Sequence, residues 1–182
     1  MGNIDNPRIW SGATVLVAPV GTTAPTDIAS SFSGTWLDIG LVGDDGISLA
    51  NEADTTKHYA FGGQKVRTSK SKFEKQFKFV AIEYGQTVFD LLHPGSTVAS
   101  AAGITTRTVK RPVPNPKAFA IELVDGDVTR RLIIPKGEVT ETGEIKLNDD
   151  EMDGVEFTVD CYEGVGNVWF YEITDDPQAV VS

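Results

Sequence analysis

Few residues of this 182-residue chain have side chains suited to chemistry. There are two histidines, His58 and His93, and one cysteine, Cys161. A nucleophilic site needs a base held beside a serine or cysteine, and neither histidine comes with a motif that would supply one. A single thiol can form neither an internal disulfide framework nor a metal site built from several thiolates. We therefore expect no enzymatic activity, no cofactor and no metal.

The segment 149–160, DDEMDGVEFTVD, comes closest to a metal-binding motif. Three acids alternate at its start, a glycine follows where an EF-hand loop turns sharply, and Asp160 stands at the twelfth place. The pattern fails at the eighth place, where Glu156 replaces an apolar residue, and the closing ligand is aspartate instead of a bidentate glutamate. The segment also continues into an alternating strand. We expect an acidic turn before a strand.

The stretch VRTSKSKFEKQFKFVAIE, residues 66–83, is the most basic part of an acidic protein. The chain carries a formal charge of -10, yet six of its 16 lysines and arginines fall within residues 65–78, with Glu74 the only acid among them. A basic strand interleaved with phenylalanines raises the question of nucleic-acid binding.

Along a strand, side chains alternate between two faces, so the aromatic and cationic positions can be separated. The odd positions are Phe73, Phe77, Phe79 and Ala81. The even positions are Lys70, Lys72, Glu74, Gln76 and Lys78. Single-strand binders place stacking rings and cations on one open surface, whereas here they lie back to back. The odd face is predicted to enter the core, and the even face to be solvated or to contact protein. Lys75 alone breaks this alternation.

Charge is distributed unevenly along the chain. Residues 122–182 hold 16 of the 26 acids and four basic residues, while residues 57–78 hold seven basic residues against one acid. Such asymmetry indicates complementary surfaces within the chain or between copies, or else two solvated faces of unlike sign.

The pattern of elements is mainly β. Apolar and β-branched runs at 13–20, 35–42, 118–135 and 155–163 lie between turn-forming residues. Within the third run, Asp125-Gly126 predicts a tight hairpin with a type I′ turn. The last run alternates cleanly and predicts a strand with one buried face.

One short helix and one long loop complete this picture. Residues 87–93 show helical spacing, with Thr87 as the expected N-cap and Pro94-Gly95 as the stop. Residues 43–65 are polar and contain glycine, which predicts a long loop, and loops of this length are usually either functional or disordered. Such a loop cannot bury enough apolar surface to become ordered alone.

We expect a single domain spanning 1–182, with a C-terminal strand and tail at 165–182. No basic segment leads into an apolar run near the start, and eighteen consecutive apolar residues occur nowhere. The sequence therefore predicts a soluble protein made in a cytoplasm, without a membrane anchor.

Taken in order, several segments resemble the major tail tube protein of long-tailed phages, in the version common among phages of actinobacteria. They are VLVAPVGTTAPTD, WLDIGLVGDDGISLANEADTTKHYAFGGQKVRTSKSKFEKQFKFVAIE, VDGDVTRRLIIPKGEVTETGEI, DGVEFTVDCYEG and VWFYEITDD. The resemblance covers nearly the whole chain, and residues 94–117 are its least distinctive part.

The resemblance implies two packed β-sheets with one short flanking helix, a β-sandwich that assembles into stacked homo-hexameric rings. The tube would belong to the virion tail, be assembled in the host cytoplasm and let double-stranded DNA pass transiently. The implied partners are the tape measure protein, the tail terminator and the distal tail proteins. The 43–65 loop would reach a neighbouring ring, where opposite charges fix partner choice. Candidate subunit contacts are Lys70, Lys72, Lys78, Glu52, Asp54 and His58.

Two other classes remain open from the residues alone. A monomeric or dimeric β-sandwich could decorate a virion and bind a receptor or capsid through the 43–65 loop. A nucleic-acid-binding β-barrel would show DNA affinity that falls with salt. Assembly state and DNA binding separate these classes.

Overall fold

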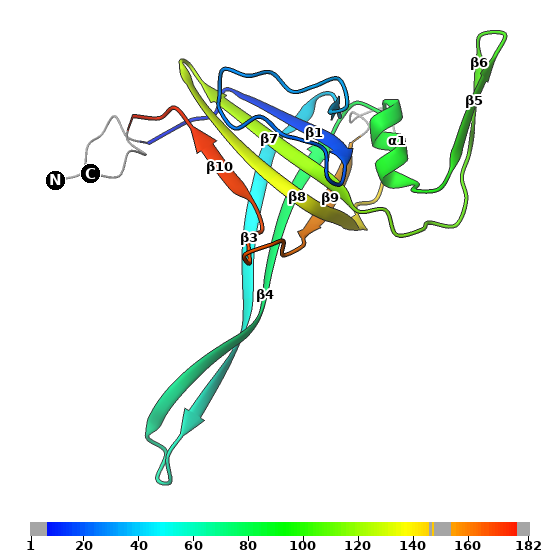
Figure 1. Ribbon diagram of the computed structural model, residues 1–182. Helices are drawn as coiled ribbons and strands as arrows, with labels where there is room; N and C mark the ends of the chain where they lie inside the picture. The colour runs from blue at the N-terminus through cyan, green and yellow to red at the C-terminus, as the bar shows by residue number, and fades with distance from the viewer. Residues whose placement is uncertain (1–6, 146, 148–153, 178–182) are drawn as a thin grey trace.

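In the computed structural model, the residues described are 7–145, 147 and 154–177. They form a mainly β structure with one short helix, as the sequence predicts (Figure 1). The elements, in chain order, are β1 (Gly12–Pro19), β2 (Leu37–Asp38), β3 (Val42–Tyr59), β4 (Lys65–Ala81), α1 (Gln86–Leu92), β5 (Thr97–Ala101), β6 (Ile104–Thr108), β7 (Lys117–Asp125), β8 (Val128–Thr142), β9 (Val155–Cys161) and β10 (Tyr171–Thr174).

The strands make two sheets of unequal size. The larger sheet has eight strands in the order β2-β1-β7-β8-β9-β4-β3, with β10 paired to β8 off this path. The smaller sheet is the β5–β6 hairpin, which stands apart from the body beyond α1 (Figure 1). Two sheets were expected to pack on each other; instead the main core is formed by the larger sheet together with α1 and Ile39, and the β5–β6 hairpin takes no part in it.

The larger sheet is strongly curved. Phe77 on β4 and Phe119 on β7 lie three strands apart in the sheet order, which in a flat sheet would separate them by about 14 Å. Their ring centroids are 5.3 Å apart, so the sheet curls around its own concave face. The curl stops short of a barrel, because no ladder in the described part of the chain joins β3 to β1 or β2.

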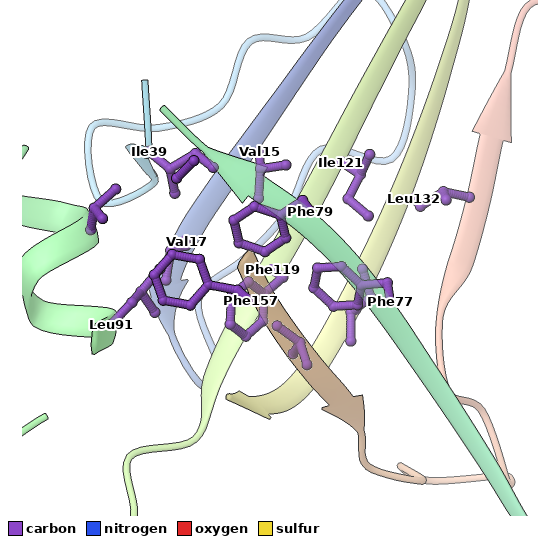
Figure 2. Packing of buried hydrophobic residues seen from close by; sticks show 14 of the residues in the cluster. Val15, Val17, Ile39, Phe77, Phe79, Leu91, Phe119, Ile121, Leu132 and Phe157 are labelled. Carbon is purple, nitrogen blue, oxygen red and sulfur yellow. The ribbon is translucent and has the colours of Figure 1, made fainter. Parts of the chain in front are cut away.

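The concave face holds the main core, shown in Figure 2. Phe79 stacks on Phe157 with 5.3 Å between ring centroids, and both rings are almost fully buried. The burial predicted for the odd positions of the strand at 155–163 is confirmed from 155 to 161, although Thr158, predicted on the open face, is buried as well. The buried odd positions are Val155, Phe157, Val159 and Cys161.

Over β7, the convex face of the sheet is covered by other side chains, including Trp36. Ala118 and Ala120 face a second cluster with Trp36 and Ile133, while Phe119 between them faces the main core.

The prediction of a strand at 35–42 is mostly wrong. Within this range only the two residues of β2 pair with β1. The Asp38 carboxylate accepts the N–H of Gly40 at 2.9 Å, and Gly40 has φ of 89°, so the chain turns away.

The predicted hairpin at 118–135 is confirmed, but its turn type is not. Asp125 pairs with Val128, so the two central residues are Gly126 and Asp127. Of these only Gly126 has positive φ, at 58°. A positive φ at the first central residue alone fits a type II′ turn, not type I′.

The short helix is present, with a different cap. α1 buries Val88, Phe89 and Leu91. Its N-cap is Gly85, without a side-chain hydrogen bond, not Thr87. Across the residues described, no helix is long and apolar enough to cross a membrane.

Candidate functional site

The most conspicuous feature of the molecule is the hairpin formed by β3 and β4, which projects far from the body (Figure 1). The prediction of a loop at 43–65 is wrong, because β3 continues to Tyr59 and pairs with β4 to the tip. Every residue from 51 to 68 is exposed. The backbone ladder orders this segment, and the usual apolar alternation is missing because neither face is covered.

A β-bulge in β4 reverses the predicted side-chain alternation. Glu52 pairs with Glu74 and Asp54 pairs with Ser71, so β4 holds one extra residue here. Lys72, inside this interval, has φ of 51°, a conformation that residues other than glycine rarely adopt. Phe73 was predicted to be core, but its side chain is 56% exposed, because it lies at the bulge and beyond the core.

The structure brings most of the candidate contact residues together on the outer hairpin. Lys72 Nζ lies 2.8 Å from Asp54 Oδ2, and the two side chains are 75% and 58% exposed. His58 Nε2 lies 3.0 Å from the Ser69 hydroxyl. Lys70 stands opposite Thr55 on β3.

The remaining two candidates lie closer to the body. Glu52 faces Glu74, and like charges directly opposite each other are destabilising in a ladder. Lys78 pairs with Ser48 and Thr158 where β4 joins the core, so it does not share the outer hairpin with the others.

Lys75 holds the base of the hairpin. Its ammonium lies 5.4 Å from the Trp169 ring centroid and 5.0 Å from that of Phe170, just before β10. Cation–π contacts of this kind fix the direction in which the hairpin leaves the body. Sequence reasoning missed this role, although Lys75 was the one lysine that broke the alternation.

The distal part of the outer hairpin is basic. Residues 55–70 contain Lys57, Lys65, Arg67 and Lys70 and no acid. Because the whole chain carries -10, the rest of the protein is more acidic still. The hairpin is thus a cationic arm attached to an anionic body.

A second feature is an apolar cleft of about 480 Å³ on the convex face. It lies between the segment 21–26, β8 and β10. Its apolar lining includes Ala24, Pro25, Trp36, Ile133, Pro135 and Ile173. Trp36 donates its indole N–H to the Thr23 carbonyl at 3.1 Å, so no unsatisfied donor points into the cleft from that ring.

Arg131 fixes the loop that walls this cleft. Its side chain is 8% exposed and donates to the carbonyls of Asp27, at 2.8 Å, and Ser30, at 2.7 Å. It also pairs with Glu122 and lies 4.9 Å from the Phe32 ring centroid. Hydrogen bonds from the Ser30 backbone and hydroxyl lower the pKa of Asp27. No sequence pattern predicted that this arginine is buried.

The residues considered for chemistry lie apart from one another. His93 caps the C-terminus of α1, while Cys161 is buried in β9 and its thiol pKa is raised to about 11, mainly by burial. Among the described residues, no group of three His, Cys, Asp or Glu could hold a metal ion. The first acids of the 149–160 segment lie outside the described residues.

Two solved structures are similar to this chain at low sequence identity. The chain is similar to the PVC sheath/tube terminator of an extracellular contractile injection system, with TM-score 0.50 and 12% identity over 93% of this chain and 99% of that chain. The sheath-tube complex of such a system gives TM-score 0.48 and 10% identity over 93% of both chains. No curated protein matches.

The family comparison covers the complete sequence. The model described as "Phage tail tube protein" matches residues 1–182. It favours a structural component of a tail over the decoration module and the nucleic-acid-binding barrel that the residues alone left open. This chain belongs to the phage tail tube protein family and is a structural tail tube protein.

Proposed function

We propose that copies of this protein assemble into homo-hexameric rings that stack into the tail tube, with the β3–β4 hairpin bridging successive rings. The observation that carries this proposal is the fully exposed run from 51 to 68, held as a ladder well away from the core. An isolated two-stranded ribbon is marginally stable in water. A neighbouring subunit would supply the cover that this ribbon lacks.

Unpaired strand edges support association in the same way. Within the described part of the chain, β3 ends the sheet, and β4 pairs with β9 only from Gln76 to Ala81. Open edges are liabilities unless they are protected or paired with another chain. We propose that sheet augmentation between copies uses these edges.

The charge separation sets the register of assembly. The cationic arm would lie against the acidic body of another copy, and opposite charges contribute more to partner choice and association rate than to affinity. Lys70, Lys72, Lys78, Glu52, Asp54 and His58 are proposed as subunit contacts on this basis.

An acidic tube suits the passage of DNA. Each phosphate that a wall neutralises releases counterions and adds a point of friction. A formal charge of -10 per copy favours a wall that repels the duplex as it slides.

The proposed setting is the virion tail, assembled in the host cytoplasm from a single-domain subunit. The tape measure protein, tail terminator and distal tail proteins would be its partners, as in the actinobacterial phage proteins it resembles. In this role the subunit acts without cofactor and without catalysis.

Assembly of the pure protein tests the proposal. Light scattering over a wide concentration range, followed by electron microscopy of the concentrated sample, should show rings or tubes. A strictly monomeric species throughout, together with no tubes in virions that contain the protein, would contradict it.

A further inference from the structure

The tip of the β3–β4 hairpin carries an aromatic knob. Phe61 is 110% exposed, and its neighbours Tyr59 and Val66 are 59% and 68% exposed. The turn is held by two backbone hydrogen bonds, from Ala60 N to Gln64 O at 2.8 Å and from Gly63 N to Ala60 O at 3.0 Å. The tip is therefore pre-organised to present Phe61 outward.

Exposing an aromatic side chain to water at the tip costs free energy unless the tip is covered. Gly62 and Gly63 have φ of 98° and 85°, so two adjacent residues with no side chain leave the phenylalanine without shelter. Exposed apolar clusters at the end of a polar arm mark interaction sites. The exposure of Phe61 means that its own chain offers it no contact, so any cover must come from another molecule.

The cleft on the convex face has the properties of a receptor for such a knob. Its volume of about 480 Å³ falls within the range of pockets that bury small apolar groups. Trp36 and Ile133 form its floor, and Tyr171 on β10, 53% exposed, stands at its edge. Arg131 fixes the loop beside it, so the cleft is preformed.

The charge of the arm is opposite to that of the rest of the chain. The knob is flanked by Lys57, Lys65 and Arg67. At the cleft itself, Glu172 is the charged lining residue, and its carboxylate is paired with Arg130 at 3.3 Å, so the cleft offers mainly apolar contact. An arm whose residues 55–70 contain no acid would be steered toward the acidic body of another copy before the aromatic contact forms.

We propose that Phe61 docks in the cleft beside β10 of a second copy of this chain. The inference rests on the proposed stacking of rings and adds to it the site at which the arm ends. Aromatic anchors in fully desolvated pockets commonly dominate interface energetics. The contact would thus couple ring to ring through one side chain per subunit.

Engineered disulfides test the docking directly. The variant Phe61→Cys/Thr26→Cys puts one thiol at the knob and one on the wall of the cleft, and the native Cys161 is buried. The matched control, Phe61→Cys/Ser100→Cys, moves the second thiol to the exposed β5. After diamide treatment of assembled tubes, we expect covalent multimers at least about tenfold more abundant than in the control, because docking raises effective concentration.

A substitution without cysteines gives an independent readout. Phe61→Ala should raise the critical concentration for tube formation at least about tenfold. The matched change Ile104→Ala, which shortens an apolar side chain that is 70% exposed on the other hairpin, should leave it unchanged.

The outcomes separate the docking from the assembly itself. If tubes form normally but Phe61→Cys/Thr26→Cys crosslinks no more than Phe61→Cys/Ser100→Cys, or does not crosslink, the docking is overturned and the tube proposal stands. A wild-type protein that makes neither rings nor tubes overturns both.

Discussion

Strand β4 contains two regions that share the backbone ladder with β3 but differ in their second neighbour and in burial. From Gln76 to Ala81 it pairs with β3 on one side and β9 on the other, and it buries Phe77 and Phe79. From Lys65 to Lys75 it pairs with β3 alone and buries no side chain completely. Backbone hydrogen bonds hold both regions in the strand conformation. Only the inner region buries side chains, so we expect only this region to stabilise the subunit. The outer region is the part that we propose contacts another copy.

The sharpest test of this difference compares two phenylalanines on the same strand. Phe79→Ala should lower the free energy of unfolding by about 3–5 kcal/mol, because it leaves a cavity in the core. Phe73→Ala, at the exposed bulge, should change it by less than about 0.5 kcal/mol. Urea unfolding of the isolated subunit measures both. Similar losses in the two variants would mean that the outer hairpin packs on the body.

The next largest effect is expected at Arg131, which ties the cleft-walling loop to the core. Arg131→Met should cost about 2–3 kcal/mol, somewhat below the usual loss for breaking a fully buried pair, because Glu122 is partly exposed. Denaturant unfolding measures the cost. Arg130→Met, at a neighbouring and more exposed arginine, is the control, and equal losses would refute the special role of Arg131.

Reversing charge on the arm should weaken assembly without unfolding the subunit. Lys70→Glu/Lys72→Glu removes the exposed contact with Asp54, and such pairs are worth about 0.2–1 kcal/mol each. Repeated around every ring, the loss of intermolecular partners should shorten or prevent tubes, as seen by electron microscopy. High salt should produce a milder form in the unmodified protein, since exposed charges are screened over about 8 Å.

The same variant separates protein contact from nucleic-acid binding. We expect unchanged DNA affinity in a filter-binding assay together with impaired assembly. Normal tubes with lost DNA affinity would show that the basic strand contacts nucleic acid.

The effect that is smallest at neutral pH, and appears only in alkali, concerns Cys161, in the buried region. Its thiol pKa is raised from 9.0 to about 11, so the thiol should resist maleimide at pH 8 until the subunit unfolds. Because the folded-state pKa is the higher one, the unfolded state ionises first. The contribution of this thiol to stability should therefore be constant below about pH 9 and be lost as the pH rises from 9 to 11. Cys161→Ala should make the fall in stability over this range smaller, and rapid labelling of the native protein would contradict the burial.

Sequence patterns predicted the parts of the fold in which burial leaves a periodic trace. The strand at 155–163 and the inner half of β4 alternate because one face meets the core. The helix near 87–93 was found from its apolar spacing, although its cap is a glycine. The hairpin at Asp125 was found from its turn residues, but the pairing register shifted the turn by one position.

The outer hairpin could not be predicted from the same signals. A strand exposed on both faces has no apolar alternation, so residues 43–65 look like a loop. The prediction that Phe73 enters the core assumed a regular alternation of side chains along the strand. The bulge at Lys72 inserts one residue, and one inserted residue reverses the alternation. The burial of Arg131 depends on carbonyls about a hundred residues earlier, a contact that no local pattern records.

The most direct test shortens the arm and leaves the core untouched. Replacing residues 53–73 with Asn-Gly would join Glu52 to Glu74, which already face each other, through a two-residue turn. We expect this variant to keep the unfolding free energy of the inner sheet and to form rings by electron microscopy, but no long tubes. Tubes of unchanged length would contradict the assignment of the β3–β4 hairpin as the bridge between rings.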